Sequence, residues 1–254
     1  MAYGRQRGCA GLDSLKMQQI QEHILKISRI IDETPSVKAF RVDLPEGADI
    51  DFCPGQFFMV SFVDDAEIKT TRAYSIASSP LNNNYLEIAL NRVGPFTTKL
   101  FSMKEGDLLK FKGPYGKVYF NEEIKNNIVL IAGGTGITPL IGIIRYCTDK
   151  NLSNKIKLIY SVKTPQDIIY KDDLEKIKNK NKNFDYVATV TRDGDSGWKG
   201  AKGRINLNLL KENIEDVNGS ICFLCGSKEF VHSIIEMLES LGVKKEQIKT
   251  DIWG

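Results

Sequence analysis

The feature that most constrains the fold is a glycine-rich turn that joins a strand-like run to a helix-like run. Residues 128–132 form a short, continuous apolar stretch of the kind found in buried strands. Gly133-Gly134-Thr135-Gly136 follows directly, and apolar residues then recur at helical spacing over residues 137–147. A strand that leads into a helix through such a turn is typical of a parallel, doubly wound sheet.

The same turn has the properties of a phosphate-binding site. Gly133, Gly134 and Gly136 carry no Cβ, so the backbone can pass close to a ligand. The helix that follows presents unpaired N–H groups and the positive end of its dipole, which favour an anion. We expect Thr138 to cap this helix and Pro139 to lie in its first turn. On this motif alone, a tight turn that binds no ligand is the open alternative.

The two halves of the chain have different patterns. Up to about residue 120, turn residues separate short apolar runs at 24–30, 37–42, 56–62 and 85–90. This spacing predicts an antiparallel β-barrel or sandwich, interrupted by one helix near residues 95–101. From residue 127 onwards, strands and helices alternate, which predicts an α/β Rossmann-like domain with a parallel sheet.

The length of 254 residues suits two domains. We predict an antiparallel β-barrel domain over residues 17–122 and the α/β domain over residues 123–254. Residues 1–16 have no clear periodicity, so we expect them to be a flexible leader or a remnant of an expression vector.

Charge and hydropathy exclude several classes of partner. The chain has 35 Lys and Arg against 32 Asp and Glu, and the net charge of +3 is too small to indicate a nucleic-acid or membrane partner. No run of about 18 apolar residues occurs, so we expect no membrane span. The N-terminus lacks the apolar core of a signal peptide, and we predict a cytoplasmic protein.

The cysteines and histidines give no metal-binding pattern. Cys222 and Cys225 form a lone C-x-x-C, and His23 and His232 are the only histidines. A structural zinc site needs four ligands at suitable spacing, and an iron–sulfur cluster needs four thiolates. We therefore predict no metal site.

A second polar motif lies in the first half of the chain, at Arg72-Ala73-Tyr74-Ser75. In a regular strand, Arg72 and Tyr74 share one face and Ser75 lies on the other. An arginine and a tyrosine side by side offer a charged fork to a phosphate and an aromatic plane to a ring system. The alternative is a barrel strand with a surface arginine.

Six short motifs, in one order along residues 20–254, resemble those of the ferredoxin–NADP⁺ reductase superfamily, which includes cytochrome b5 reductases and oxygenase reductases. They are Pro54-Gly55-Gln56-Phe57, Arg72-Ala73-Tyr74-Ser75, Gly94-Pro95-Phe96-Thr97, Gly113-Pro114-Tyr115-Gly116, the turn from Gly133 to Pro139, and Cys225-Gly226-Ser227. Each motif is short, but all six in order are specific.

The resemblance implies that the barrel binds a flavin, FAD rather than FMN. Tyr74 would then pack on the isoalloxazine ring, and Ser75 would hydrogen-bond near flavin N5. Arg72 would pair with the flavin phosphate. The segment from Gly94 through Thr97 to Thr98 would meet the pyrophosphate at the start of a helix.

The resemblance also implies that the second half binds a nicotinamide dinucleotide. Gly226 would accompany Cys225 beside the nicotinamide, and Trp253 would shield the flavin face until the nicotinamide displaces it. The predicted catalytic residues are Ser75, Cys225 and Trp253. Asp251 stands where many members carry Glu, which argues against a proton-relay role. The residues of the turn expected to bind the dinucleotide are Gly133, Gly134, Thr135, Gly136 and Thr138.

The choice between NADPH and NADH stays open. Arg192 and Arg204, with Lys163, could hold the 2′-phosphate of NADPH. The acidic neighbours Asp193 and Asp195 would repel that phosphate, and simple loop solvation explains the arginines equally well.

We predict that hydride passes from the nicotinamide to FAD and that electrons then leave to a separate acceptor. Ferredoxin is the first expected partner, followed by flavodoxin or an oxygenase component. The alternatives are a reductase of free flavin or quinone, and a non-catalytic nucleotide-binding subunit of a larger redox complex. The many lysines of residues 150–182 indicate a solvated helix end more than a docking patch for an acidic carrier.

Overall fold

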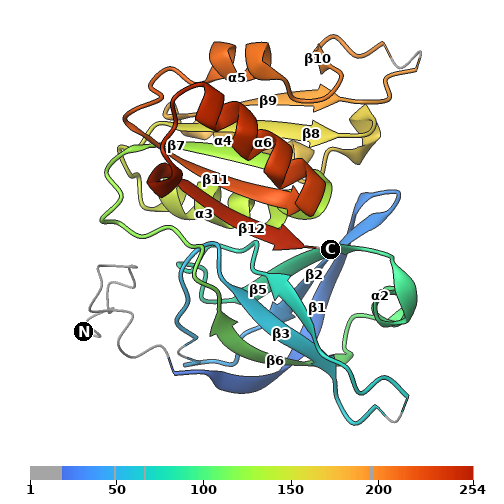
Figure 1. The fold of residues 1–254 in the computed structure, drawn as a ribbon. Helices are drawn as coiled ribbons and strands as arrows, with labels where there is room; N and C mark the ends of the chain where they lie inside the picture. The colour runs from blue at the N-terminus through green and yellow to red at the C-terminus, as the bar shows by residue number, and fades with distance from the viewer. Residues whose placement is uncertain (1–18, 49, 66, 195–196, 254) are drawn as a thin grey trace.

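The computed structural model describes residues 19–253 apart from residues 49, 66, 195 and 196, and the side chain of Trp253 is also not described. The predicted leader, residues 1–16, therefore lies outside the described residues, as does Asp195. Figure 1 shows two units, each built around one sheet.

The first unit is a six-stranded antiparallel sheet in the order β4-β3-β6-β1-β2-β5. The edge strands β4 and β5 lie against each other, so the sheet curls into a nearly closed barrel (Figure 1). Its elements are β1 (Gln21–Thr34), β2 (Val37–Asp43), β3 (Phe57–Phe62), β4 (Arg72–Ser75), β5 (Tyr85–Asn91), α2 (Gly94–Ser102) and β6 (Leu108–Tyr115).

Alternation along the strands explains the barrel core. In β3, Phe58, Val60 and Phe62 are buried, whereas the residues between them are half-buried. Because successive side chains of a strand point to opposite faces, one face of β3 fills the barrel interior. Phe111 of β6 and Phe40 of β2 join the same cluster.

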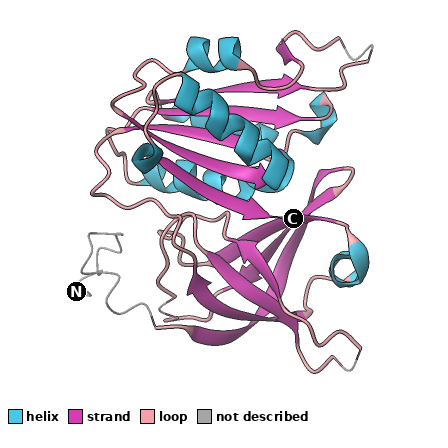
Figure 2. Ribbon diagram, viewed as in Figure 1, coloured by secondary structure: helices cyan, strands magenta, loops and turns pink. Residues whose placement is uncertain are grey.

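The second unit is a six-stranded parallel sheet in the order β10-β9-β8-β7-β11-β12, with helices on both faces (Figure 2). Its strands are β7 (Asn127–Gly133), β8 (Ile156–Val162), β9 (Phe184–Val190), β10 (Ala201–Lys202), β11 (Ser220–Ser227) and β12 (Ile248–Trp253). Its helices are α3 (Ile137–Asp149), α4 (Lys171–Lys180), α5 (Leu207–Asn213) and α6 (Lys228–Ser240). The predicted combination of an antiparallel barrel and a Rossmann-like domain is thus confirmed.

Strand β11 shows how the two faces of this sheet are filled. Phe223 and Cys225 pack with α3 on one face, and Cys222 and Leu224 pack with α5 and α6 on the other. The two cysteines of the C-x-x-C therefore point to opposite faces, where they cannot share a metal ion. Among the described residues, no group of three or more His, Cys, Asp or Glu could hold one.

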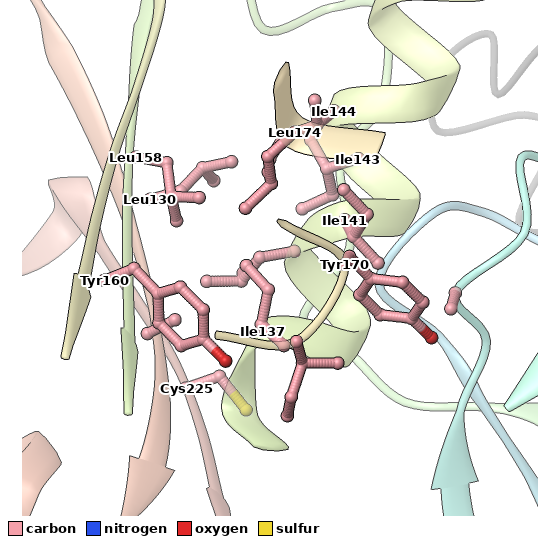
Figure 3. Packing of buried hydrophobic residues seen from close by; sticks show 14 of the residues in the cluster. Leu130, Ile137, Ile141, Ile143, Ile144, Leu158, Tyr160, Tyr170, Leu174 and Cys225 are labelled. Carbon is pink, nitrogen blue, oxygen red and sulfur yellow. The ribbon is translucent and has the colours of Figure 1, made fainter. Parts of the chain in front are cut away.

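The barrel contributes to the core on the α3 face of the parallel sheet. Ala77 and Ala89 belong to the same buried cluster as Ile137, Ile141 and Ile144 of α3. Figure 3 shows Ile137 between α3 and the strands and Ile141 beside the ring of Tyr170, whose hydroxyl is directed toward the barrel. The two units therefore share one apolar contact surface.

Within the described part of the chain, no helix is long and apolar enough to cross a membrane.

Candidate functional site

The Arg72-Ala73-Tyr74-Ser75 motif forms strand β4, which pairs with β3 in regular register. Regular pairing places Arg72 and Tyr74 on the same face of the strand. Both line a cavity of about 280 Å³, whose opposite wall is made by the β5 end and the start of α2. Gly94 and Phe96 are among the residues of that wall.

Tyr74 and Arg72 are available to a ligand in this cavity. The Tyr74 ring lies 6.1 Å from the Phe96 ring, and burial raises the pKa of its phenol to about 12, although Arg72 lowers it slightly. Tyr74 is therefore a neutral hydrogen-bond donor at physiological pH. Arg72 is exposed, with its guanidinium 5.8 Å from the Phe96 ring centre, and it has no carboxylate partner among the described residues.

Helix α2 begins at the cavity without a side-chain cap. Its N-cap residue, Val93, makes no side-chain cap hydrogen bond, so the first N–H groups of the helix are free to bind an anion. The Thr97 hydroxyl, in contrast, accepts from Val93 N at 2.6 Å and donates to Val93 O at 2.7 Å. Thr97 is only 6 % exposed and lines the cavity, whereas Thr98 is exposed.

The glycine-rich turn lies at the carboxyl end of β7, where the strand order reverses between β7 and β11. Dinucleotides bind at such switch points in doubly wound sheets. Gly134 has φ +53°, and a Cβ on Gly136 would lie 2.2 Å from the carbonyl oxygen of Cys225. Glycine at position 136 thus lets the turn lie directly against the end of β11, next to Gly226.

The predicted cap of α3 is wrong. The helix begins at Ile137 with Gly136 as its N-cap, and Pro139 lies in the first turn as expected. Thr138 is inside the helix and buried, and its hydroxyl donates to the carbonyl of Thr135 at 2.8 Å. The reason is that the three residues Gly134–Gly136 form a 3₁₀ turn, which starts the helical path before Thr138.

Asp251 joins the two units at one point. Cys225 Sγ lies 3.9 Å from Asp251 Oδ2, and the two residues are register partners on β11 and β12. Burial raises the pKa of Asp251, and hydrogen bonds from Cys225 and Ser75 lower it in part. Ser75 of the barrel and Cys225 of the parallel sheet therefore meet at one half-buried carboxyl group.

Sequence reasoning gave Asp251 no role, and the structure brings it to the centre of the candidate site. The signal that could have revealed it is its position in the strand-like C-terminal run, level with Cys225. Trp253 lies two residues further along β12, where its backbone pairs with Ser227. Its predicted shielding role depends on a side chain outside the described residues.

A second cavity, of about 300 Å³, opens at the carboxyl ends of the parallel strands. Arg204 lines it, together with Ser161, Thr191 and Glu229. The predicted partner of Arg204, Arg192, is exposed and does not line it, although its backbone N–H donates to the Lys163 carbonyl at 2.7 Å.

The acidic neighbour Asp193 forms an ion pair with Lys202 at 2.5 Å. Lys202 is thus bound to Asp193 and does not add a second positive charge next to Arg204 for a 2′-phosphate.

The lysine-rich segment contains helix α4, and four of its lysines, Lys150, Lys155, Lys157 and Lys178, form ion pairs with acidic residues. Asp185 contacts both Lys157, at 2.5 Å, and Lys178, at 2.7 Å, and Lys155 lies 3.4 Å from Glu215. These pairs favour the interpretation of a solvated surface over a docking patch.

Taken together, the residues present fit a flavin and a nicotinamide dinucleotide. The barrel offers an exposed guanidinium, an aromatic side chain and an uncapped helix start around one cavity. The parallel sheet offers a turn without Cβ atoms and a cavity at its switch-point edge. The Ser75, Cys225 and Asp251 cluster lies between these two sets.

Comparison with known proteins assigns both units. Residues 25–120 match the oxidoreductase FAD-binding domain family, and residues 130–235 match the oxidoreductase NAD-binding domain family. The glycine betaine monooxygenase reductase subunit of Pseudomonas aeruginosa is 28% identical over 236 residues, covering 91% of this chain and 64% of its own. This chain thus spans less than two thirds of that relative.

Two further similar proteins also match more than nine tenths of this chain. The NADH-cytochrome b5 reductase 1 of Aspergillus clavatus is 28% identical over 242 residues, covering 91% of this chain and 77% of its own. The solved structure of a ferredoxin reductase in carbazole 1,9a-dioxygenase superposes with a TM-score of 0.81 at 26% identity, over 92% of this chain and 70% of that one. The chain is therefore an FAD- and NAD(P)-binding oxidoreductase of the ferredoxin–NADP⁺ reductase superfamily.

Proposed function

We propose that the protein oxidises a reduced nicotinamide coenzyme and passes the electrons, through FAD, to a separate acceptor protein. The observation that carries this proposal is the contact of Ser75, Cys225 and Asp251. Ser75 follows the Tyr74 platform of the FAD-binding unit, and Cys225 borders the turn of the NAD-binding unit. The two ring systems would have to meet at this point for hydride to pass between them.

Each residue set has its own task in this proposal. When bound, FAD supplies the conversion from two-electron to one-electron chemistry. Tyr74 provides a flat surface for its ring system, while Arg72 and the free N–H groups of α2 neutralise its phosphates. Gly133 to Gly136 bind the coenzyme pyrophosphate. Shielding of the flavin until the nicotinamide arrives is assigned to Trp253, whose side chain lies outside the described residues.

Ser75 and Cys225 orient the reacting rings through hydrogen bonds. Asp251 accepts from both side chains and fixes their positions. Because its pKa is raised by burial, Asp251 can also hold a proton at a pH where an exposed aspartate cannot.

We propose NADH as the preferred coenzyme. The cavity at the carboxyl ends of the strands holds one guanidinium, Arg204, and one carboxylate, Glu229. Its local charge is balanced, whereas the 2′-phosphate of NADPH needs an excess of positive charge. The ribose hydroxyls of NADH need only hydrogen-bond partners, which Ser161 and Thr191 can offer.

For the acceptor we propose a separate electron carrier, a ferredoxin first and then a flavodoxin or an oxygenase component. The names of two relatives support this proposal, one being the reductase subunit of a monooxygenase and the other a ferredoxin reductase in a dioxygenase. The likeness covers most of this chain in both cases.

The acceptor can be tested by NADH-driven turnover with a [2Fe–2S] ferredoxin, a flavodoxin and free FMN in parallel. We expect saturation with one of the carrier proteins and rates that fall with added salt, because charged protein surfaces steer such encounters. Saturation with free FMN alone would instead favour a reductase of free flavin. FAD that neither coenzyme reduces would favour a non-catalytic subunit.

A further inference from the structure

Arg145 is a charged residue in the apolar helix α3, and its side chain reaches into the barrel. Its Nη1 donates to Glu87 Oε1 at 2.7 Å and to the carbonyl of Ala77 at 2.8 Å. Its Nη2 donates to Asp173 Oδ2 of α4. The Arg145 side chain is 13% exposed and that of Glu87 is fully buried, so this contact is inside the molecule.

The barrel side of this contact continues directly into the flavin motif. Ala77 stands two residues after Ser75, and its N–H donates to the Glu87 carbonyl at 2.8 Å. A Cβ on Gly142 of α3 would lie 2.7 Å from the Ile76 carbonyl oxygen. Arg145 and Gly142, one helical turn apart, therefore hold the peptide that follows Ser75 against α3.

The other end of α3 continues into the coenzyme turn. The helix begins at Ile137, immediately after the Gly134–Gly136 turn. One rigid helix thus carries the coenzyme turn at its start and the barrel contact at Arg145. Its position sets the distance between the two.

We propose that Arg145 is a positioning residue for hydride transfer: by binding Glu87 and the Ala77 carbonyl, it fixes the coenzyme turn relative to Ser75. The proposal rests on the hydride-transfer function proposed above. Hydride transfer depends steeply on the placement of the reacting atoms, and a displacement of about 1 Å can slow such a step about 100-fold.

Only arginine meets all the contacts at this place. The planar guanidinium donates to an acceptor on each side of the contact, which a lysine ammonium cannot do in the same geometry. The ring of Tyr170 lies 4.8 Å from the Arg145 guanidinium, and Glu87 Oε2 accepts from Arg41 Nε at 2.7 Å. Glu87 is thereby held from the barrel side and from α3 at once.

The test compares Arg145→Lys with Lys150→Met in the whole 254-residue chain. Lys150 lies at the end of the same helix and pairs at 2.9 Å with Glu122, which lies in the segment between β6 and β7. We expect Arg145→Lys to lower the limiting rate of FAD reduction by NADH about 10- to 100-fold. The NADH dissociation constant and the FAD content should stay within about twofold, because neither binding set is altered. Lys150→Met should leave all three quantities unchanged.

A second readout needs no bound FAD. In the flavin-free protein, amide hydrogen exchange at residues 76 and 77 should become about tenfold or more faster in Arg145→Lys, because the contact that holds this peptide is weakened. Lys150→Met should exchange there like the wild type. A merely stabilising role would speed exchange throughout the molecule and leave the limiting rate unchanged.

If Arg145→Lys does not fold, Glu87→Gln decides the question, since it keeps the shape and removes the charge that Arg145 binds. Glu87→Gln should also slow FAD reduction and speed amide exchange at residues 76 and 77, each to a smaller extent than Arg145→Lys. Wild-type reduction rate and wild-type exchange in a folded variant would overturn the proposal. Failure of the proposed function looks different, because NADH would then not reduce the FAD of the wild type.

Discussion

The thiol of Cys225 donates a hydrogen bond to the carboxyl group of Asp251, with 3.9 Å between Sγ and Oδ2. Both residues lie on the parallel sheet, yet Ser75 of the barrel is close enough to the same carboxyl group to lower its pKa. A half-buried acid thus marks one place where the FAD-binding and NAD-binding units meet. Its environment leads to a testable dependence on pH.

Replacing Asp251 with Asn should stabilise the protein at neutral pH. Burial raises the pKa of Asp251 in the folded state. The contribution of Asp251 to the free energy of unfolding is therefore fully favourable below its pKa in the unfolded chain, and it is lost as the pH rises through its pKa in the folded protein. At pH 7 the ionised carboxylate therefore destabilises the fold. Asn keeps an acceptor for Ser75 and Cys225 and should raise Tm by about 2–4 °C, the shift that accompanies 1 kcal/mol in a chain of this size.

Asp185→Asn is the matched control, and it should have the opposite sign. Although burial alone would raise it, hydrogen bonds from Lys157 and Lys178 lower the pKa of Asp185 to about 2. The contribution of Asp185 to the free energy of unfolding is present above its pKa in the unfolded chain and is lost as the pH falls toward 2. Because Asp185 is half exposed, the loss at pH 7 should be less than about 1 kcal/mol. Thermal melts from pH 3 to pH 8 should show the two variants diverging as the pH rises, and parallel curves would contradict the account.

Removing the Ser75 hydroxyl should slow FAD reduction and leave FAD bound. Ser75→Ala deletes one hydrogen bond at the meeting point of the two units, so we expect a fall in the reduction rate of about 10-fold, which corresponds to about 1.4 kcal/mol. Ser75→Thr keeps a hydroxyl and should recover most of the rate. Stopped-flow measurement of the flavin absorbance gives this rate, and identical rates in the wild type and the alanine variant would remove Ser75 from the mechanism.

Neutralising Arg72 should weaken FAD binding. Arg72→Gln removes a guanidinium that has no carboxylate partner among the described residues, so the FAD dissociation constant should rise about 10- to 100-fold and its dependence on salt should decrease. Lys99→Gln is the control, because Lys99 already pairs with Asp65 on the same side of the barrel. Flavin fluorescence titration measures both constants. Equal affinities in the two variants would show that the phosphate binds elsewhere.

Charge in the cavity at the carboxyl ends of the strands should govern the choice of coenzyme. Glu229→Gln leaves Arg204 without its opposing charge, so kcat/KM for NADPH should rise about 10-fold while that for NADH changes little. Glu236→Gln, on the exposed side of the same helix, should change neither value. An unaltered NADPH to NADH ratio in Glu229→Gln would contradict the proposed basis of NADH preference.

Local patterns in the sequence predicted most of the fold. Helix α3 was expected over residues 137–147 and extends over Ile137–Asp149, because its apolar spacing and its glycine turn are local features. The Arg72 and Tyr74 pair was expected on one face of a strand, and the regular pairing of β4 with β3 gives that arrangement.

Contacts between distant segments were not predictable in the same way. Asp251 meets Ser75 only because β12 joins the edge of the parallel sheet next to the barrel. The Thr97 hydroxyl donates to the Val93 carbonyl, a partner that the sequence does not specify, and its predicted contact with phosphate stays a prediction.

Arg145 and Glu87 did leave a signal in the sequence. Both are charged residues inside otherwise apolar runs, one in the helix pattern of residues 137–147 and the other in the strand pattern of residues 85–90. Buried charges are paired in proteins, so two such residues are candidates for a mutual contact. The pattern alone does not show which two elements bring them together.

The most direct test of the central claim is the visible absorption spectrum of the purified protein, recorded before and after anaerobic addition of NADH and, on a fresh sample, of NADPH. The account predicts a flavin spectrum that bleaches on mixing, and faster with NADH than with NADPH. A colourless protein that remains colourless after incubation with FAD and FMN would contradict it.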